Sequence, residues 1–227
     1  TTWSRGLGDV YKRQVPSLTW VSDINSILMN GFKPVFVDID LHTLSISPEK
    51  VIKKINKKTL AVFITHAQGF NGFTDNLLKE LKKRNILLIE DVCESHGAKH
   101  KDKKLGTFGI ISNFSFYYAH HMTTIEGGMI CTNDKKTYEL SKIFRSHGMV
   151  RETKNKNFEK EMIRKHKDLS PQFIFLHPTL NFRNNEIGAV IGINQLKDLN
   201  KNNQERTKNF KFFLKNLNKK KYWTDFK

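Results

Sequence analysis

The sequence has few cysteines and no long uninterrupted apolar run. Its 227 residues include only two cysteines, Cys93 and Cys131, which supply neither a disulfide framework nor a C-x-x-C pair. We therefore expect reduced thiols in a reducing compartment. A helix that spans a bilayer needs about 20 consecutive apolar residues, and neither such a run nor a signal-peptide pattern is present. These absences predict a cytoplasmic protein without a membrane segment.

Acidic residues are also scarce. The chain has 22 Asp and Glu against 39 Lys and Arg, a formal net charge of +17. Such a charge can indicate nucleic-acid binding. The lysines, however, are scattered as K-K and K-x-K pairs, and no basic patch interleaved with aromatic residues is present. We therefore expect no nucleic-acid partner, and the positive charge instead favours an anionic small molecule.

Residues 1–14 differ in character from the rest of the chain. Residues 9–14, D-V-Y-K-R-Q, resemble the translation of a sequencing-adapter end, and they join abruptly onto V-P-S-L-T-W at residues 15–20. We exclude residues 1–14 from fold prediction for this reason. The native chain is expected to begin upstream of the sequence shown.

Apolar runs alternate with amphipathic segments along the chain. Strands are predicted at residues 33–39, 60–65, 86–89 and 129–132. Helices are predicted from residue 47 onward and at residues 74–84, 184–199 and 204–217, and a surface loop is predicted at residues 154–167. Strands that are apolar on both faces and separated by helices indicate an α/β fold, with a mostly parallel sheet covered by helices.

Two of the predicted helices carry clear local signals. Ser47, Pro48 and Glu49 combine a cap, a proline in the first turn and an early acid. In residues 74–84, Leu77, Leu78 and Leu81 share one helical face. Ligands of such sheets bind beyond the carboxyl ends of the strands, where Asp91 is expected to lie.

Residues 114–128 read F-S-F-Y-Y-A-H-H-M-T-T-I-E-G-G. This segment resembles the cofactor loop of the DegT/DnrJ/EryC1/StrS sugar aminotransferase family, in which F-S-F-Y, two residues and a lysine precede a spacer and E-G-G. The family lysine binds pyridoxal 5'-phosphate (PLP) covalently. Here His120 stands at that position. An imidazole cannot form the covalent bond, but it titrates near neutrality and can move protons.

The resemblance covers residues 15 to about 213. It implies an aspartate-aminotransferase-like (fold type I) fold and a chain that is a fragment of a longer protein. Residues 15–200 would form part of the large cofactor-binding domain, and residues 201–227 the start of a truncated C-terminal small domain. It also implies a homodimer with shared active sites.

Four positions match cofactor-binding residues of the family. By resemblance, Trp20 stacks on the pyridine ring, and Asp91, in I-E-D-V-C-E-S-H-G-A, pairs with the ring nitrogen and keeps it protonated. Glu94 lies near the ring oxygen, and Ser115 binds the phosphate. Taken alone, Trp20 could be a core or interface residue, Asp91 an ordinary strand-end acid, and Glu94 a solvated loop acid.

Three further positions follow downstream. Arg151 comes shortly after residues 144–148, which match the family's R-x-H-G segment, and Asn181 and Arg183 lie in residues 181–189, which match the family pattern N-x-R-x-x-E-x-x-A. By resemblance, Asn181 reaches the cofactor phosphate of a neighbouring subunit. Arg151 and Arg183 would bind a dicarboxylate amino donor, because guanidinium groups pair well with carboxylates. Both arginines could equally be surface charges.

The adjacent pair His120 and His121 could suggest a metal site. Neighbouring residues of an extended chain point to opposite faces, however, and no carboxylate or cysteine stands at a familiar ligand spacing. We therefore expect no metal.

With histidine in place of lysine, the sequence resembles the sugar 3-dehydratases within the family. The resemblance implies an untethered cofactor, PLP or its amino form pyridoxamine 5'-phosphate (PMP), with glutamate as amino donor and His120 as base. The reaction would remove the carbon-3 hydroxyl of a GDP-linked 4-keto-6-deoxy sugar, in deoxysugar and lipopolysaccharide O-antigen biosynthesis. The GDP preference rests on overall similarity around the site, because the upstream segment that supplies sugar contacts in the family is absent from the sequence.

Three alternatives stay open. A CDP-sugar 3-dehydrase also has histidine here but carries an iron–sulfur cluster that needs four cysteines, whereas this sequence has two. A nucleotide-sugar aminotransferase is disfavoured by the missing lysine. A non-catalytic relic is the third alternative, and the retained Trp20, Asp91 and Ser115 argue against it.

Overall fold

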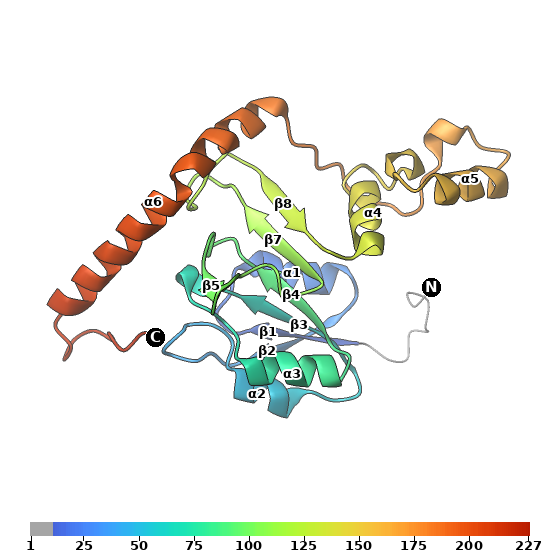
Figure 1. Cartoon of the computed structure of the whole chain (residues 1–227). Coiled ribbons are helices and arrows are strands. Elements are labelled where there is room, and N and C mark those ends of the chain that lie inside the picture. The colour runs from blue at the N-terminus through green and yellow to red at the C-terminus, as the bar shows by residue number, and fades with distance from the viewer. Residues whose placement is uncertain (1–10) are drawn as a thin grey trace.

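The computed structural model describes residues 11–227 and is built on a six-stranded sheet (Figure 1). In spatial order the strands are β2 (Lys33–Val37), β1 (Lys12–Pro16), β3 (Thr59–Thr65), β4 (Leu87–Asp91), β7 (Ile111–Ser115) and β8 (Gly128–Cys131). The first five are parallel, and β8 runs antiparallel to β7. A small hairpin of β5 (Lys99–His100) and β6 (Lys103–Lys104) lies outside this sheet. The predicted mostly parallel sheet is confirmed.

Strand β1 begins three residues before the boundary that the sequence suggested. Lys12, Arg13 and Gln14 pair with both β2 and β3. The charged residues hide the strand from a pattern search, but Arg13 stacks 3.4 Å above the centre of the Phe32 ring and Gln14 is buried. The exclusion of these three residues from the fold is therefore corrected. The adapter origin of residues 1–14 stays a prediction, and residues 1–10 lie outside the described part of the chain.

The helices are α1 (Val21–Met29), α2 (Pro48–Lys54), α3 (Asp75–Lys83), α4 (Lys135–Phe144), α5 (Lys156–Lys165) and α6 (Glu186–Asn216). Three short 3-10 turns are η1 (Ala67–Gly69), η2 (Val150–Glu152) and η3 (Pro171–Phe173). The predicted starts of α2 and α3 are confirmed, since the Ser47 side chain accepts a hydrogen bond from the Lys50 amide and the Thr74 side chain accepts one from the Leu77 amide. No helix within residues 11–227 is both long and apolar enough to cross a membrane.

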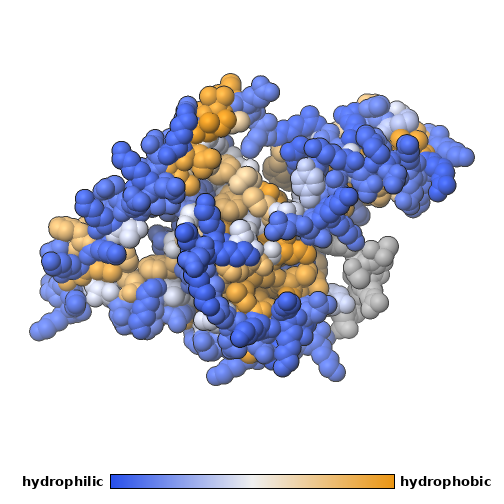
Figure 2. Space-filling model, in the orientation of Figure 1, coloured by the Kyte–Doolittle hydropathy of each residue, from blue (hydrophilic) through white to orange (hydrophobic). Residues whose placement is uncertain are grey.

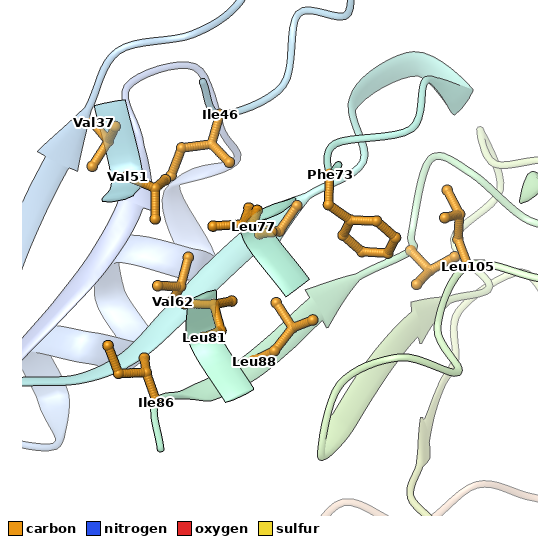
Figure 3. Packing of buried hydrophobic residues seen from close by; sticks show 12 residues of the cluster. Val37, Ile46, Val51, Val62, Phe73, Leu77, Leu81, Ile86, Leu88 and Leu105 are labelled. Carbon is orange, nitrogen blue, oxygen red and sulfur yellow. The ribbon is translucent and has the colours of Figure 1, made fainter. Parts of the chain in front are cut away.

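Helices α2 and α3 lie side by side on one face of the sheet and bury the main core (Figures 1 and 3). This cluster includes Val37, Val51, Val62, Leu77, Leu81 and Leu88. Leu77 is fully buried and Leu81 nearly so, as their spacing predicts. Burying one such side chain stabilises the fold by about 1.5–3 kcal/mol. Helix α1 contacts β1 and β2, and the right-handed connection between these two strands places it on the opposite face.

Two sequence predictions for the second half are wrong. Residues 154–167 form no simple surface loop, because α5 occupies most of this segment. Its Phe158 and Met162 pack against Val150 and Ile174 in a small second core. The two helices predicted between residues 184 and 217 are one helix, α6, which runs through the predicted domain boundary at residue 200.

Helix α6 leaves the body of the sheet and exposes much of its apolar side (Figures 1 and 2). The apolar residues Ile187, Val190, Ile193 and Leu196 are each more than half exposed. The chain after α6 returns to the loop that follows β2. There Trp223 Nε1 donates to the Leu41 carbonyl at 3.1 Å. The Phe226 ring stacks on Phe70, which follows η1, with 5.5 Å between ring centres.

Candidate functional site

The five parallel strands end at the same edge of the sheet, and four of them carry the candidate site. Strands β1, β3, β4 and β7 end at Pro16, Thr65, Asp91 and Ser115. Helix α1 follows β1 with Trp20 as its N-cap, and the His120 loop (residues 116–127) follows β7. From β1 the chain proceeds to β2 on one side, and from β3 it proceeds to β4 on the other. The connections therefore diverge between β1 and β3, which is where open α/β sheets bind ligands.

Asp91 is buried at the end of β4, with 5% of its surface exposed. Its Oδ1 accepts hydrogen bonds from the Cys93 amide at 2.9 Å and from Asn113 Nδ2 at 3.0 Å. These donors hold the carboxyl group in one orientation. Burial and the neighbouring Asp91 raise the pKa of the Cys93 thiol well above its ordinary value, so this cysteine stays protonated and is no nucleophile.

Asp23, in the first turn of α1, is a site residue that sequence reasoning missed. It is 4% exposed. Its Oδ2 accepts hydrogen bonds from Thr19 Oγ1 at 2.5 Å and Thr65 Oγ1 at 2.9 Å. Burial and the negative charge of Asp91 raise the pKa of Asp23 to about 7. An acid in the first turn of a helix is common, so the sequence offered no signal that this one is buried.

Glu90 precedes Asp91 in β4 and faces the opposite way, as alternation along a strand requires. It is fully buried and accepts three backbone amides of residues 106–109 at 2.6–2.7 Å and His66 Nε2 at 3.3 Å. Burial alone would raise the pKa of Glu90, but these hydrogen bonds outweigh it and leave the pKa below its ordinary value. Glu90 thus fixes the loop between β6 and β7 beneath the site.

The His120 loop is closed at its base by backbone hydrogen bonds. The Phe116 amide donates to the Gly127 carbonyl, and the Thr124 amide donates to the Phe116 carbonyl, both at 2.9 Å. A side chain at Gly127 would collide with Thr124 Oγ1, which explains a glycine in E-G-G. The His120 amide donates to Tyr117 at 3.1 Å. Its imidazole is therefore carried on a loop with fixed ends.

His96 and His121 accompany His120, and sequence reasoning assigned neither a role in the site. The ring centre of His96 lies 6.3 Å from that of His120 and 5.7 Å from that of His121. Burial, followed by nearby positive groups, lowers the pKa of each to about 4. His96 Nε2 and His121 Nδ1 are buried without a hydrogen-bond partner. Both rings are therefore neutral at physiological pH.

Trp20 and Glu94 occupy the same edge. Trp20 is 72% exposed, so it is not a core residue of this chain, and its indole face is accessible for stacking. Glu94 follows β4 and is held by η1, because its Oε2 accepts hydrogen bonds from the amide and the side chain of Gln68 at 3.1 and 3.3 Å. Glu94 is thus a fixed acid and not a freely solvated one.

Asn181, Arg183 and Arg151 lie in a different region, next to the end of α4. Asn181 forms a bridge with Ser146, and Arg183 Nη2 donates to Ser146 Oγ at 2.8 Å. Arg151 Nη1 donates to Gln172 Oε1 at 3.4 Å. The structure groups these residues by contacts within residues 146–183, and their roles toward a cofactor or amino donor stay predictions.

The residues at the strand ends fit a phosphorylated pyridine. A buried carboxyl group, an accessible indole, a serine hydroxyl and a histidine lie at one edge, and the buried nitrogen atoms of His96 and His121 lack partners. Within residues 11–227, no group of three or more His, Cys, Asp or Glu could hold a metal ion.

Comparison with known proteins adds an independent line of evidence. The model of the DegT/DnrJ/EryC1/StrS aminotransferase family matches residues 12–225. The GDP-4-keto-6-deoxy-D-mannose 3-dehydratase of Escherichia coli O55:H7 is 35% identical over 200 residues, which cover 88% of this chain and 51% of that protein. The GDP-perosamine synthase of Escherichia coli O157:H7 is 40% identical over 136 residues, or 60% of this chain and 37% of that protein.

A solved structure agrees with these matches. A GDP-4-keto-6-deoxymannose-3-dehydratase with a trapped PLP–glutamate geminal diamine superposes with a TM-score of 0.73 at 32% identity, covering 85% of this chain and 50% of that one. The chain spans about half the length of the dehydratases that it matches. The fold, the order of motifs and the family match agree, and the chain belongs to the DegT/DnrJ/EryC1/StrS aminotransferase family.

Proposed function

We propose that this chain is part of a PLP- and PMP-dependent 3-dehydratase that removes the carbon-3 hydroxyl of GDP-4-keto-6-deoxymannose, with glutamate as amino donor. The observation that carries the proposal is His120, which stands in the loop after β7 where the aminotransferases of the family have lysine. The similarity to a dehydratase over 88% of the chain supports it, as does the solved dehydratase with PLP and glutamate.

The residues at the strand ends have distinct roles in this proposal. When bound, PMP supplies an amine that reacts with the sugar ketone and a pyridine ring that withdraws electrons. Asp91 would accept a hydrogen bond from the protonated ring nitrogen, and Trp20 would stack on the ring. Ser115 would donate its hydroxyl to the phosphate. Glu94 would lie near the ring oxygen.

His120 acts as the base. Its imidazole would take a proton from the cofactor carbon that bears the amine and would pass it to the departing carbon-3 hydroxyl of the sugar, which would leave as water. Because residue 120 has no primary amine, this chain would hold the cofactor without a covalent bond, and the cofactor would supply an amine derived from glutamate.

The region near α4, which lies apart from the strand ends, supplies the proposed contacts to glutamate and to a second subunit. Arg151 and Arg183 bind the two carboxylates of glutamate. Asn181 binds the cofactor phosphate of a second copy of the chain, so we propose a homodimer with shared sites. The exposed apolar residues of α1 and α6 support such an interface. A cytoplasmic enzyme of deoxysugar and O-antigen biosynthesis is part of the same proposal.

The test uses the full-length protein, PLP, glutamate and GDP-4-keto-6-deoxymannose. Release of ammonia together with a 3-deoxy sugar is the expected result. The second candidate is a nucleotide-sugar aminotransferase, which the match to GDP-perosamine synthase favours. Transfer of glutamate nitrogen to carbon 4 of the sugar, with the carbon-3 hydroxyl retained, would reject dehydration and support this candidate.

A further inference from the structure

Two acidic side chains, Asp23 and Asp91, lie next to each other at the carboxyl ends of the parallel strands. Thr65 and Asp91 are paired residues of the neighbouring parallel strands β3 and β4, so their side chains point to the same face. Thr65 Oγ1 donates to Asp23 Oδ2 at 2.9 Å. Thr65 therefore places the carboxyl group of Asp23, which comes from α1, beside that of Asp91.

Both carboxyl groups are removed from water. Asp23 is 4% exposed and Asp91 is 5% exposed. The groups that face the pair are the hydroxyls of Thr19 and Thr65, the amide of Asn113 and the protonated thiol of Cys93. These polar groups can donate hydrogen bonds but bring no compensating charge. Ionising both carboxyl groups in such surroundings is costly, so the pair retains one proton.

We propose that Asp23 is a positioning residue that shares one proton with Asp91 and thereby sets the negative charge that meets the ring nitrogen of the cofactor. This inference rests on the proposed function, which assigns the ring nitrogen to Asp91. A positively charged ring favours the ionised pair, so the bound ring releases the shared proton to solvent. By reciprocity, loss of that proton strengthens binding of the ring.

The experiment measures the affinity of the full-length protein for PMP between about pH 6 and pH 8 in the wild type and in Asp23→Asn. Asparagine keeps the size of the side chain but cannot ionise. Because burial and Asp91 raise the pKa of Asp23 to about 7, the wild type gains affinity over this interval relative to the variant. We expect the two affinities to agree within about twofold at the lower pH and to differ by about tenfold at the higher pH. Comparing the ratio cancels the protonation of free PMP.

Two controls separate charge at this position from general effects. Asp38→Asn removes an exposed carboxylate that pairs with Lys50. The ratio of wild-type to Asp38→Asn affinity for PMP should stay at one over the whole pH range. A cofactor analogue with carbon in place of the ring nitrogen carries no charge there, and wild type and Asp23→Asn bind it with a constant ratio. Thr65→Val removes a hydroxyl that stabilises ionised Asp23, so the gain in PMP affinity seen in the wild type should shift to higher pH.

A second measurement needs neither a variant nor a cofactor. Carboxyl carbon NMR of aspartate-labelled wild-type protein should show one buried carboxyl group that titrates near neutral pH. A constant affinity ratio for Asp23→Asn, or only ordinary carboxyl titrations in the wild type, would overturn the inference. If the wild type binds neither PMP nor PLP, the proposed function fails instead, and the NMR titration still decides whether the pair shares a proton.

Discussion

In the proposed function, residue 120 determines whether the cofactor is bound covalently. We expect His120→Lys to retain PLP covalently, because a lysine amine in this loop can react with the PLP aldehyde. The measurement is the visible absorbance of the protein after desalting and denaturation. Dehydration should fall by a factor of about 10²–10⁴, the usual contribution of a positioned base.

His120→Asn is the matched control, since it removes the base without supplying an amine. It should lose dehydration to a similar extent while PLP washes out on desalting. If His120→Lys also lost PLP on desalting, the rest of the loop would differ from that of an aminotransferase, and the comparison of residue 120 with the family lysine would be wrong.

Glu90 gives a prediction on stability. Replacing it with glutamine leaves loop amides facing an NH₂ group and removes the carboxylate that contacts His66 Nε2, so Glu90→Gln should lower the free energy of unfolding by about 3 kcal/mol. Urea denaturation measures this. Glu80→Gln breaks only a surface pair with Arg84 and should cost less than about 1 kcal/mol. Equal costs would show that the buried network contributes little.

The site could be predicted only where a motif marks it. His120, Asp91 and Ser115 stand in a recognisable order, and the structure places Asp91 and Ser115 at strand ends and His120 on the loop that follows β7. Asp23 and His96 belong to the same region, but their importance arises from burial and from neighbours distant in sequence. A single acid on a helix or a single histidine in a loop carries no pattern from which this could be predicted.

Among the elements, strands and capped helices were predictable, because apolar periodicity and capping residues are local. Helix α5 was not, since lysines and glutamates surround its few apolar residues and hide the i, i+4 pair of Phe158 and Met162. Helix α6 was divided in the prediction because residues 200–203 are rich in asparagine, a modest helix former. The helix continues through them, and Asn203 Nδ2 donates to the His96 carbonyl at 2.7 Å.

A prediction for α5 follows from its small core. Met162→Ala should destabilise the segment by about 2–3 kcal/mol, because Met162 is buried against Val150 and Ile174. Hydrogen exchange of amides in residues 156–165 should accelerate accordingly. Lys160→Ala, on the exposed side of the same helix, should leave exchange nearly unchanged. Fast exchange already in the wild type would favour the surface loop that the sequence suggested.

For the whole molecule, the shifted titrations predict how stability depends on pH. The pKa values of His96 and His121 are lowered to about 4, against about 6.5 in an unfolded chain. Between these values the unfolded chain binds more protons, so stability rises with pH. Asp23, whose pKa is raised to about 7, acts in the opposite sense from about pH 4 to pH 7.

Two histidines outweigh one aspartate, so we expect a net gain in stability from about pH 4 to about pH 6.5 and a slight loss from there to about pH 7. Urea midpoints measured over this range provide the check. His121→Gln should reduce the gain, and Asp23→Asn should enlarge it and abolish the loss above pH 6.5. Midpoints that do not change with pH would contradict the burial of these groups.

The position of β1 has a consequence for how the protein is made. Both of its hydrogen-bonded neighbours, β2 and β3, come later in the chain. During synthesis on the ribosome, β1 lacks at least one of its two neighbouring strands until Thr65, the last residue of β3, has been synthesised. A nascent chain that stalls before this point presents an unpaired strand to its neighbours, so slow translation of this stretch would promote aggregation.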